Sequence, residues 1–388
     1  MTMKTILQAF QGIANIVTAT PEWQVMSATV EDSPWHREAS VAVHTTMCIE
    51  FYLNEVLPKV RRTDTQAITT LVALLFHDFG KPEAEETVVR ADGTPYRRYA
   101  GHEPISANAM IDLVMRDSTL KELLDACTVD LRAVKFMIEN HLPYGMTNKT
   151  KLANMALAVQ LNCDPDCFYD MLWSDCNGRI SDDHEMKRQN VLTWIEMFKA
   201  VEPTKYRHAP ADQKTMFVLV GQVGAGKSTW IKERTAAFGG PAKFTVISED
   251  DARERFFERE ADEASKERVS YMDPKSAYTA KWQFAADAGS KFQAFVLNEQ
   301  RDAVNSGKTL ILDRTNRTRK ARGAMIALAR QHGYKIVSVE FYVSLQTSLD
   351  RQRTRPDKSV PYTVAKNMFY QFQVPWFGVE VDAVQTVM

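Results

Sequence analysis

The chain has 388 residues, of which 45% are hydrophobic and 25% are charged, and its formal net charge at pH 7 is −1. This composition is ordinary for a globular protein and excludes a low-complexity chain, while the length favours two domains over one. No apolar run approaches the roughly 18 residues of a membrane-spanning helix, and residues 1–4 lack the pattern of a signal peptide. We therefore expect a cytoplasmic protein without a membrane partner.

The cysteines do not form a recognisable metal or disulfide pattern. They are odd in number, lack zinc-finger spacing and include one close pair, Cys163 and Cys167. Such usage is typical of reduced thiols in a cytosolic protein. The five residues are Cys48, Cys127, Cys163, Cys167 and Cys176.

The charges are divided unequally along the chain. Residues 1–213 carry a net charge of −8, and residues 214–388 carry +7. This change of sign supports two domains, and the basic half is the one expected to meet a polyanion, although many proteins with this charge bind no nucleic acid. We predict a first domain over 1–205, a linker over 206–214 and a second domain over 215–388.

The first half of the chain has the apolar periodicity of helices. Between two of them, the polar stretch 85–101 contains the turn signal DGTP at 92–95, which predicts a surface loop or a hairpin. A short polar segment flanked by prolines follows the last helix and forms the predicted linker. The predicted helices cover residues 41–57, 67–76, 131–140, 151–160, 168–176 and about 182–201.

Histidines and aspartates lie on or next to these apolar helix ends. An unpaired polar group is costly at such positions, so each side chain requires a partner. Imidazole together with carboxylate suits a divalent transition metal. Taken singly, each histidine would more often be structural, but the set predicts a metal site. It consists of His44, His77, Asp78, His102, His141 and Asp175.

The order H…HD…H…H…D, with the local sequence HDFGKP, resembles the HD superfamily of metal-dependent phosphohydrolases over residues 30–180. The resemblance implies an all-α helical domain. It also implies that four residues hold one metal ion, namely His44, His77, Asp78 and Asp175. His102 and His141 would complete a second metal site or bind substrate phosphate.

Two further residues take roles from the same resemblance. Lys81, just after the His-Asp pair, would act with Asp78 in catalysis by stabilising phosphate charge or helping to protonate a leaving group. His36 is a candidate for phosphate contact, with a structural role as the alternative. The implied mechanism is attack of a metal-activated water on a phosphoester. The number of ions, one or two, and their identity among Mn, Ni, Co, Zn and Fe are left open by the resemblance.

From residue 215 the periodicity changes to that of alternating strands and helices. Strands are predicted at 216–220, 244–247, 309–312 and 335–343, with helical segments between them. This alternation predicts an α/β domain with a parallel sheet, in which ligands gather at the carboxyl ends of the strands.

The first of these strands runs into Gly221–Ser228, which reads GQVGAGKS and fits G-x-x-x-x-G-K-[S/T] ahead of a helix. Backbone N–H groups of such a loop point at phosphate oxygens, and the helix N-terminus adds positive potential. Lys227 is expected to reach the β- and γ-phosphates, and Ser228 to hold Mg²⁺. The predicted ATP-binding residues of this segment are Gly221, Gly224, Ala225, Gly226, Lys227, Ser228 and Thr229.

Three features distinguish a kinase from other P-loop proteins. No GTPase-type N/T-K-x-D sequence follows the later strands. The sequence SEDDAR at 248–253 places carboxylates and an arginine at the end of a strand, where they can accept a proton from an acceptor hydroxyl and hold a phosphate. The sequence LDRQRTRP at 349–356 places three arginines where a kinase lid closes over the triphosphate.

At these residues the chain resembles the 5′-hydroxyl polynucleotide kinase family over most of residues 214–375. The shared motifs are GQVGAGKSTW, ISEDDAR, ILDRTN and R-x-x-x-R followed by KSVP at 358–361. The resemblance implies Asp250 as the general base and Arg253 as a contact to the acceptor's phosphate. It also implies acceptor-site residues Asp313 and Asn316 and lid residues Arg351 and Arg355, of which Arg355 is catalytic. The third motif is one residue longer than in the phage prototype, so Asn316 departs most from the pattern.

An HD phosphohydrolase joined to such a kinase resembles the end-healing enzymes of bacteria and viruses. That resemblance implies ATP-dependent phosphorylation of 5′-OH ends together with removal of a 2′,3′-cyclic phosphate or a 2′- or 3′-phosphate. The partners would be RNA or DNA ends, ATP and a separate ligase. A haloacid dehalogenase phosphatase is excluded because no D-x-D-G-T sequence is present. The alternative is a nucleotide-metabolism enzyme that combines an HD nucleotidase with a nucleoside kinase.

Overall fold

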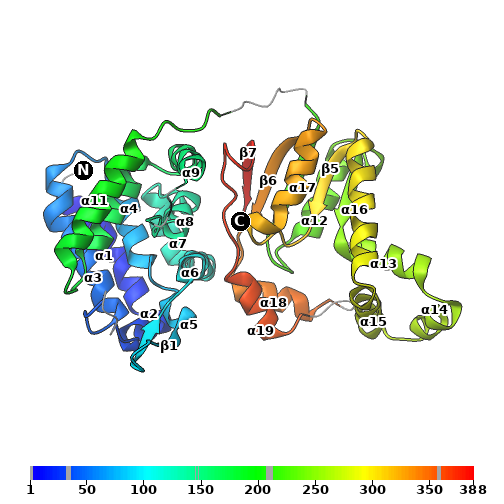
Figure 1. Ribbon diagram of the computed structural model, residues 1–388, viewed down its shortest axis with the longest axis horizontal. Coiled ribbons are helices and arrows are strands. Elements are labelled where there is room, and N and C mark those ends of the chain that lie inside the picture. The colour runs from blue at the N-terminus through cyan, green and yellow to red at the C-terminus, as the bar shows by residue number, and fades with distance from the viewer. Residues whose placement is uncertain (1–2, 32–35, 145, 147, 207–212, 356–359) are drawn as a thin grey trace. The chain divides into compact units, whose positions relative to one another are not determined.

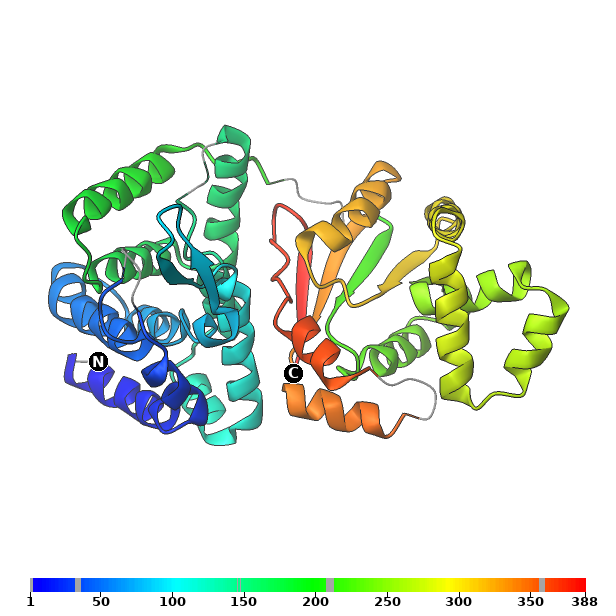
Figure 2. The same ribbon diagram turned by 60° about the horizontal axis from the view of Figure 1, so that its bottom comes forward.

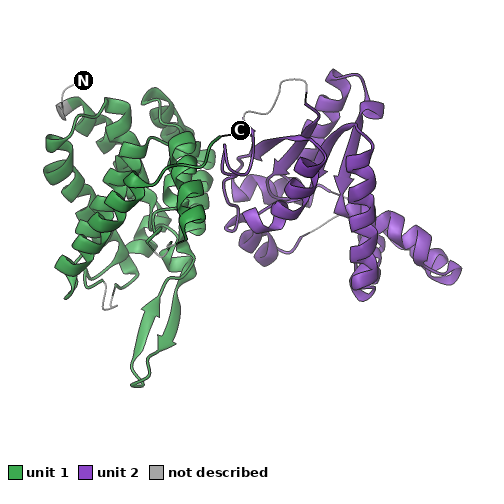
Figure 3. Ribbon diagram, turned by 45° about the horizontal axis from the view of Figure 1, so that its top comes forward, with its two compact units in different colours: residues 1–206 green, residues 207–388 purple. Residues whose placement is uncertain are grey.

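The computed structural model describes residues 3–31, 36–144, 146, 148–206, 213–355 and 360–388. Two compact units divide the chain at residues 206 and 207, and Figure 3 colours them separately. Three predicted segments lie partly outside the described residues: 207–212 of the linker, 33–35 beside His36, and 356–359 after the lid arginines. The two units are therefore described one at a time.

The N-terminal unit is a helical bundle around α4 (Asp64–Phe76) (Figure 1). Residues 67–76 of this helix are all buried, because the run is apolar apart from two threonines. A capping box between Thr63 and Gln66 satisfies two backbone N–H groups at its start. The other helices are α1 (Met3–Thr18), α2 (Pro21–Ala28), α3 (Val41–Phe51), α5 (Lys81–Ala84), α6 (His102–Arg116), α7 (Ser118–Ala126), α8 (Leu131–Glu139), α9 (Lys149–Asn162), α10 (Pro165–Asn177) and α11 (His184–Ala200).

This unit departs from the all-α prediction in one place. Strands β1 (Glu86–Val89) and β2 (Pro95–Arg98) form an antiparallel hairpin with Glu86 opposite Arg98, within the stretch predicted as a loop or hairpin. Figure 3 shows the hairpin extending from the helices. Each predicted helix overlaps an observed one, and α3 continues as a π-helical turn (Tyr52–Val56) before Pro58. Among the described residues, no helix has the length and apolar character needed to cross a membrane.

The C-terminal unit contains a five-stranded parallel sheet with the strand order β4-β5-β3-β6-β7. The strand that precedes the glycine-rich loop, β3, lies in the middle, paired with β5 on one side and β6 on the other. The edge strand β7 was not predicted. The strands are β3 (Thr215–Val220), β4 (Phe244–Ser248), β5 (Thr309–Asp313), β6 (Lys335–Phe341) and β7 (Ala383–Val387).

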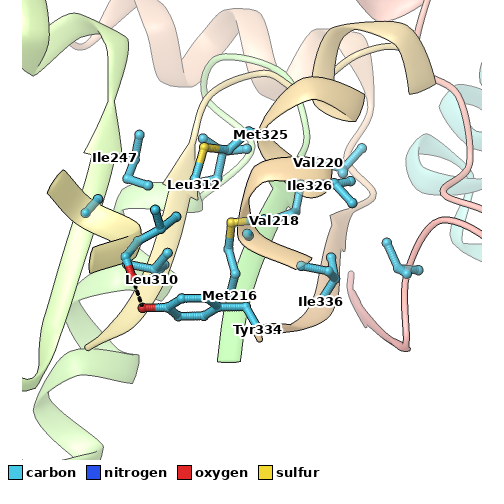
Figure 4. Close-up of a cluster of buried hydrophobic side chains, with 14 of the residues drawn as sticks. Met216, Val218, Val220, Ile247, Leu310, Leu312, Met325, Ile326, Tyr334 and Ile336 are labelled. Carbon is cyan, nitrogen blue, oxygen red and sulfur yellow. Dashed lines mark hydrogen bonds between the residues drawn. The ribbon is translucent and has the colours of Figure 1, made fainter. Parts of the chain in front are cut away.

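Both faces of this sheet are covered, so its central strands are apolar on both sides. Met216, Val218 and Val220 of β3 pack on one face against Met325 and Ile326 of α17 (Arg319–Gln331), as Figure 4 shows. On the other face, the alternate residues of β3 pack against Trp230 of α12 (Lys227–Ala237). The sheet thereby fixes the loop between β3 and α12 on a rigid base.

Between β4 and β5 the chain forms a lobe of four helices, which extends away from the sheet (Figure 2). Three of these helices pack around Phe256, whose ring contacts those of Phe284, Phe292 and Phe295, and the fourth packs through Val269 against Phe257. The lobe consists of α13 (Glu249–Glu260), α14 (Glu263–Ser270), α15 (Pro274–Asp287) and α16 (Ser290–Asn305). After β6 follow α18 (Leu345–Arg353) and α19 (Tyr362–Phe369).

A buried ion pair ties α17 to the C-terminal segment. Arg322 has no exposed surface, pairs with Glu380 through two nitrogens and donates to the Asn316 carbonyl oxygen at 2.9 Å. We expect Arg322→Leu to lower the free energy of unfolding of this unit by about 3–5 kcal/mol, because Glu380 loses its guanidinium partner. The double variant with Glu380→Leu should recover much of this loss. Calorimetric unfolding of the full chain checks both, and a double variant no more stable than the single one would contradict the account.

Candidate functional site

The N-terminal unit brings all six predicted metal ligands to one buried place. They come from five separate helices or helix ends and lie within the bundle, each at most 5% exposed. His77 and Asp78 follow the end of α4, where the chain turns toward α5. The remaining ligands are His44 on α3, His102 at the start of α6, His141 just after α8 and Asp175 on α10.

Each of the four histidines holds a backbone carbonyl oxygen with Nδ1. The contacts are His44 to Gly178 at 2.9 Å, His77 to Leu74 at 2.6 Å, His102 to Tyr99 at 2.8 Å and His141 to Ile138 at 2.7 Å. Because a carbonyl oxygen can only accept, Nδ1 carries a proton in each of these contacts, and Nε2 faces the cluster. This is the arrangement by which proteins fix the tautomer and orientation of a metal-binding histidine.

Asp78 lies between two pairs of histidines, His44 with His77 and His102 with His141, which form the two halves of the cluster. Its Oδ2 is 3.4 Å from His44 Nε2 and 3.3 Å from His77 Nε2, while its Oδ1 is 3.1 Å from His102 Nε2 and 3.9 Å from His141 Nε2. Asp175 adds a carboxylate oxygen 3.1 Å from His44 Nε2. Imidazole nitrogens and carboxylate oxygens at this spacing form a donor set that fits a divalent transition metal.

Charge within the cluster favours the metal-binding forms of Asp78 and His141 but not those of His44 and His77. Burial alone would raise the pKa of Asp78, but His77 and Lys81 lower this pKa well below its usual value. Burial and the neighbouring His102 lower the pKa of His141 to about 4. Asp78 is therefore ionised and His141 neutral at pH 7, as metal ligation requires.

Burial opposes a charge on His44 and His77, but Cys48 and Asp175 raise the pKa of His44 to about 10, and Asp78 and Asp175 raise the pKa of His77 well above its usual value. A metal ion would therefore have to displace a proton from each of these two rings.

Lys81 is buried at the edge of the cluster. Its Nζ lies 2.8 Å from Asp78 Oδ2 and 2.6 Å from Glu31 Oε1. Burial opposes its charge, but these two carboxylates raise the pKa of Lys81 above its usual value. Lys81 thus keeps a positive charge beside the metal ligands and holds the Asp78 carboxylate in place.

Several residues near the cluster were missed by sequence reasoning. The Cys48 thiol lies 3.6 Å from His44 Nε2 and belongs to one metal-sized group with His44, His77 and Asp175. Since Cys48 lies one helical turn after His44, its spacing could have indicated this.

Arg179 contacts Asp175, and Glu38 lies between His36 and His44. His36 itself stands edge-on to the His44 ring, with centroids 4.8 Å apart. All five cysteines are free.

The glycine-rich loop of the C-terminal unit lines a cavity of about 620 Å³ at the carboxyl ends of the strands. Gly224 and Gly226 have φ angles of 84° and 102°, in the left-handed region that favours glycine. A side chain at Gly224 would also meet the Ser348 carbonyl oxygen at 2.6 Å. Lys227 donates to the carbonyl oxygens of Gly221 and Gln222, and burial lowers its pKa to about 8.

Most predicted ATP-site residues line this cavity. They are Gly224, Gly226, Lys227, Ser228, Thr229, Arg351 and Arg355. Asp250, predicted as the general base, and Asp313, predicted for the acceptor site, line the same cavity. Gly221 and Ala225 lie beneath the loop instead, against Phe341 and the core on that face of the sheet. Arg351 donates to the Gly224 carbonyl oxygen at 3.2 Å, which places the predicted lid helix α18 over the loop.

Asp250 is the second residue of α13, which follows β4 directly, and it lines the same cavity. Its Oδ1 accepts hydrogen bonds from Arg253 at 2.9 Å and from the Tyr278 hydroxyl at 3.0 Å. Tyr278, on α15, and Arg314, after β5, also line the cavity. Tyr278 was missed because its segment carries no motif, and Arg314 because the resemblance assigns no role to this position of ILDRTN. The carboxylate is therefore held in one orientation beside the loop.

Asn316 lies apart from this cavity. Its side chain is 3% exposed, and its Nδ2 donates to the carbonyl oxygens of Leu219 at 2.8 Å and Leu312 at 3.2 Å. These contacts join β3 to β5, so the side chain holds the two strands together at the carboxyl end of the sheet. Arg314 and Thr315, its neighbours in the longer motif, line the cavity instead.

The comparison with known families concerns the C-terminal unit. Residues 216–375, from β3 to the segment after α19, match the family model of an AAA domain. The glycine-rich loop, α12 and the strands β4, β5 and β6 lie within the match, together with all but the first residue of β3, whereas β7 lies beyond it. The C-terminal unit is thus similar to a P-loop domain of kinase-like AAA type, which implies ATP with Mg²⁺, and the helical N-terminal unit carries a candidate metal-binding cluster.

Proposed function

We propose that the protein heals broken nucleic-acid ends. Its C-terminal unit phosphorylates 5′-OH polynucleotide ends with ATP. Its N-terminal unit removes a 2′,3′-cyclic phosphate, or a 2′- or 3′-phosphate, so that RNA or DNA ends become substrates for a ligase. The observation that carries the proposal is the Asp250 carboxylate, which lines the ATP cavity and is held by the Arg253 guanidinium.

In the kinase reaction, the chain supplies positioning and charge. The loop amides and Lys227 bind the phosphates, Ser228 holds the Mg²⁺ that accompanies ATP, and Arg351 and Arg355 cover the triphosphate. Asp250 accepts the proton of the 5′-hydroxyl. At the same time, the hydroxyl oxygen forms a bond to the γ-phosphorus, and the bond between that phosphorus and the leaving ADP oxygen breaks. Tyr278 and Arg253 keep the Asp250 carboxylate oriented for this transfer.

In the phosphohydrolase reaction, the histidine Nε2 atoms, Asp78 and Asp175 would hold the metal. Asp78 lies between His44 and His77 on one side and His102 and His141 on the other, so it would help to hold a metal ion with either pair. Such an ion activates water and neutralises phosphate oxygens. Lys81 fixes Asp78 and adds positive charge for the leaving phosphate.

One substrate tests both halves together. An RNA oligonucleotide with a 5′-OH and a 2′,3′-cyclic phosphate is incubated with the protein, ATP and a panel of divalent metals, and both ends are analysed by mass spectrometry. We expect the 5′ end to gain a phosphate and the 3′ end to lose its cyclic phosphate. Change at neither end, with phosphorylation of free nucleosides, would instead support the nucleotide-metabolism alternative.

Asp250→Asn separates the proposed base from ATP binding. We expect 5′ phosphorylation to fall by about 10²- to 10⁴-fold, because the amide cannot accept the hydroxyl proton, while ATP affinity stays nearly unchanged. Radiolabel transfer and calorimetric titration with ATP measure the two quantities. Asp287→Asn, on the exposed face of α15, is the matched control. An Asp250→Asn protein with normal kinase activity would remove Asp250 from the mechanism.

A further inference from the structure

A second cavity, of about 520 Å³, lies in the C-terminal unit between the helical lobe and α17. Glu249, the first residue after β4, and Arg314, just after β5, both line it, so it opens at the carboxyl ends of these strands. Arg314 also lines the ATP cavity, which makes the two cavities neighbours. The side chains used below are Glu249, Arg253, Trp282, Phe292, Leu297 and Arg314.

The walls of this cavity are apolar and partly open to solvent. Trp282 is 46% exposed and Leu297 50% exposed, although large apolar side chains are usually covered. The Phe292 ring, 9% exposed, contributes a deeper wall. No atom lies within 4 Å of the position where a side chain at Gly289 would begin, so the mouth is open on that side. A flat apolar ring can enter between these walls.

The rim of the cavity carries two arginines and one carboxylate. Arg253 and Arg314 each reach Glu249 at 2.5 Å, and the Arg253 guanidinium lies 5.8 Å from the centre of the Phe292 ring. Arg253 also pairs with Asp250 at 2.9 Å, so two carboxylates hold the two guanidinium groups in place. An aromatic cavity with guanidinium groups at its rim suits a ligand that joins a flat ring to an anionic group, as a nucleotide does.

The cavity is also joined to the proposed general base. Arg253, on its rim, donates to Asp250, and Tyr278 donates to the same carboxylate oxygen. Tyr278 and Trp282 lie one turn apart on α15 and thus share a face of that helix. A strand whose 5′-hydroxyl meets Asp250 therefore finds Trp282 one helical turn further along the same surface.

We propose that this second cavity binds the heterocyclic base of the 5′-terminal nucleotide of the acceptor strand, stacked on Trp282, with Arg253 and Arg314 facing the adjoining phosphate. The inference rests on the proposed 5′-kinase function and adds to it a requirement: the first nucleotide of the acceptor must carry a base. No contact to the functional groups of the base is needed, so all four bases are accepted.

Trp282→Ala tests the stacking surface. We expect the KM for a 5′-OH oligonucleotide to rise by about 5- to 100-fold, the range for loss of one base–aromatic stack, with kcat and the KM for ATP nearly unchanged. Trp282→Phe should retain most of the affinity. Tyr271→Ala, which removes an 83% exposed aromatic side chain from outside the cavity, is the matched control. A Trp282→Ala protein with unaltered KM would overturn the proposal.

Substrates with a missing base locate the contact. For the wild-type protein, an oligonucleotide that is abasic at its first nucleotide should show the same rise in KM, and one that is abasic at its third nucleotide should show none. For Trp282→Ala, the intact and the first-position abasic oligonucleotides should be equal, because the two changes remove one interaction. If both proteins discriminate equally, the base does not stack on Trp282. If the wild-type protein phosphorylates no 5′-OH oligonucleotide, the proposed kinase function is itself wrong.

Discussion

Replacing Asp78 with alanine is expected to reduce metal-dependent phosphate release by about 10²- to 10³-fold or more, as the loss of a strong electrostatic contact at a reacting centre does. The reason is its central position: one carboxylate oxygen faces His44 and His77, and the other faces His102. Its removal takes a ligand from both halves of the cluster. It also leaves Lys81 with one carboxylate partner fewer.

The second unit of the same chain supplies the internal control for this variant. Kinase activity should be unchanged, which shows that the protein is folded and active. Metal content, measured by mass spectrometry after dialysis, should fall together with phosphate release. Asp125→Ala removes a carboxylate from the exposed surface of α7 and should change neither quantity. Full phosphate release by the Asp78→Ala protein would refute the metal centre.

Replacing Lys227 with alanine is expected to reduce 5′ phosphorylation by about 10²- to 10⁴-fold, because its ammonium group stabilises charge on the transferring phosphate. In the structure Lys227 lines the cavity, and its ammonium group donates hydrogen bonds to the Gly221 and Gln222 carbonyl oxygens. It is thus held in readiness for the phosphates by the loop itself.

Transfer of labelled phosphate from ATP to a 5′-OH oligonucleotide measures this effect. Lys232→Ala, an exposed lysine on the same helix, is the control and should behave as the wild-type protein. Phosphate release by the N-terminal unit should remain, so the two variants, Asp78→Ala and Lys227→Ala, should each abolish one activity and spare the other. Labelling that survives in Lys227→Ala would sink the kinase proposal.

The parts of the fold that were predicted correctly depend on local sequence. The run 67–76 is apolar almost without interruption, and β3 is followed at once by glycines and a lysine. Helix α6 was missed because polar residues such as Ser106 and Asn108 are buried on its inner face, which breaks the apolar period. The edge strand β7 was missed because its sequence, Ala383–Val387, is short and half polar, and only its pairing with β6 makes it a strand.

The candidate sites show the same limit. His44, His77 and Asp175 could be placed together because the family resemblance gives their order, whereas no pattern gives the positions of Glu31 or Arg179. These side chains reach the cluster through tertiary packing of distant segments. Asn316 shows the converse: its motif suggested an acceptor contact, but its buried amide joins two strands. The sequence does not show that the carbonyl oxygens of Leu219 and Leu312 need a side-chain donor, so this role of Asn316 could not be predicted.

The central place of β3 has a consequence for local stability. Its backbone is paired on both edges and covered on both faces, so its amide hydrogens can exchange with water only when the whole unit unfolds. The four-helix lobe rests on a small cluster around Phe256 and can open by itself at lower cost. The glycine-rich loop is therefore anchored in the part of the unit that opens last. Trp282 belongs to the lobe, which can adjust its conformation to nucleic-acid ends of different shape if the proposed acceptor site is correct.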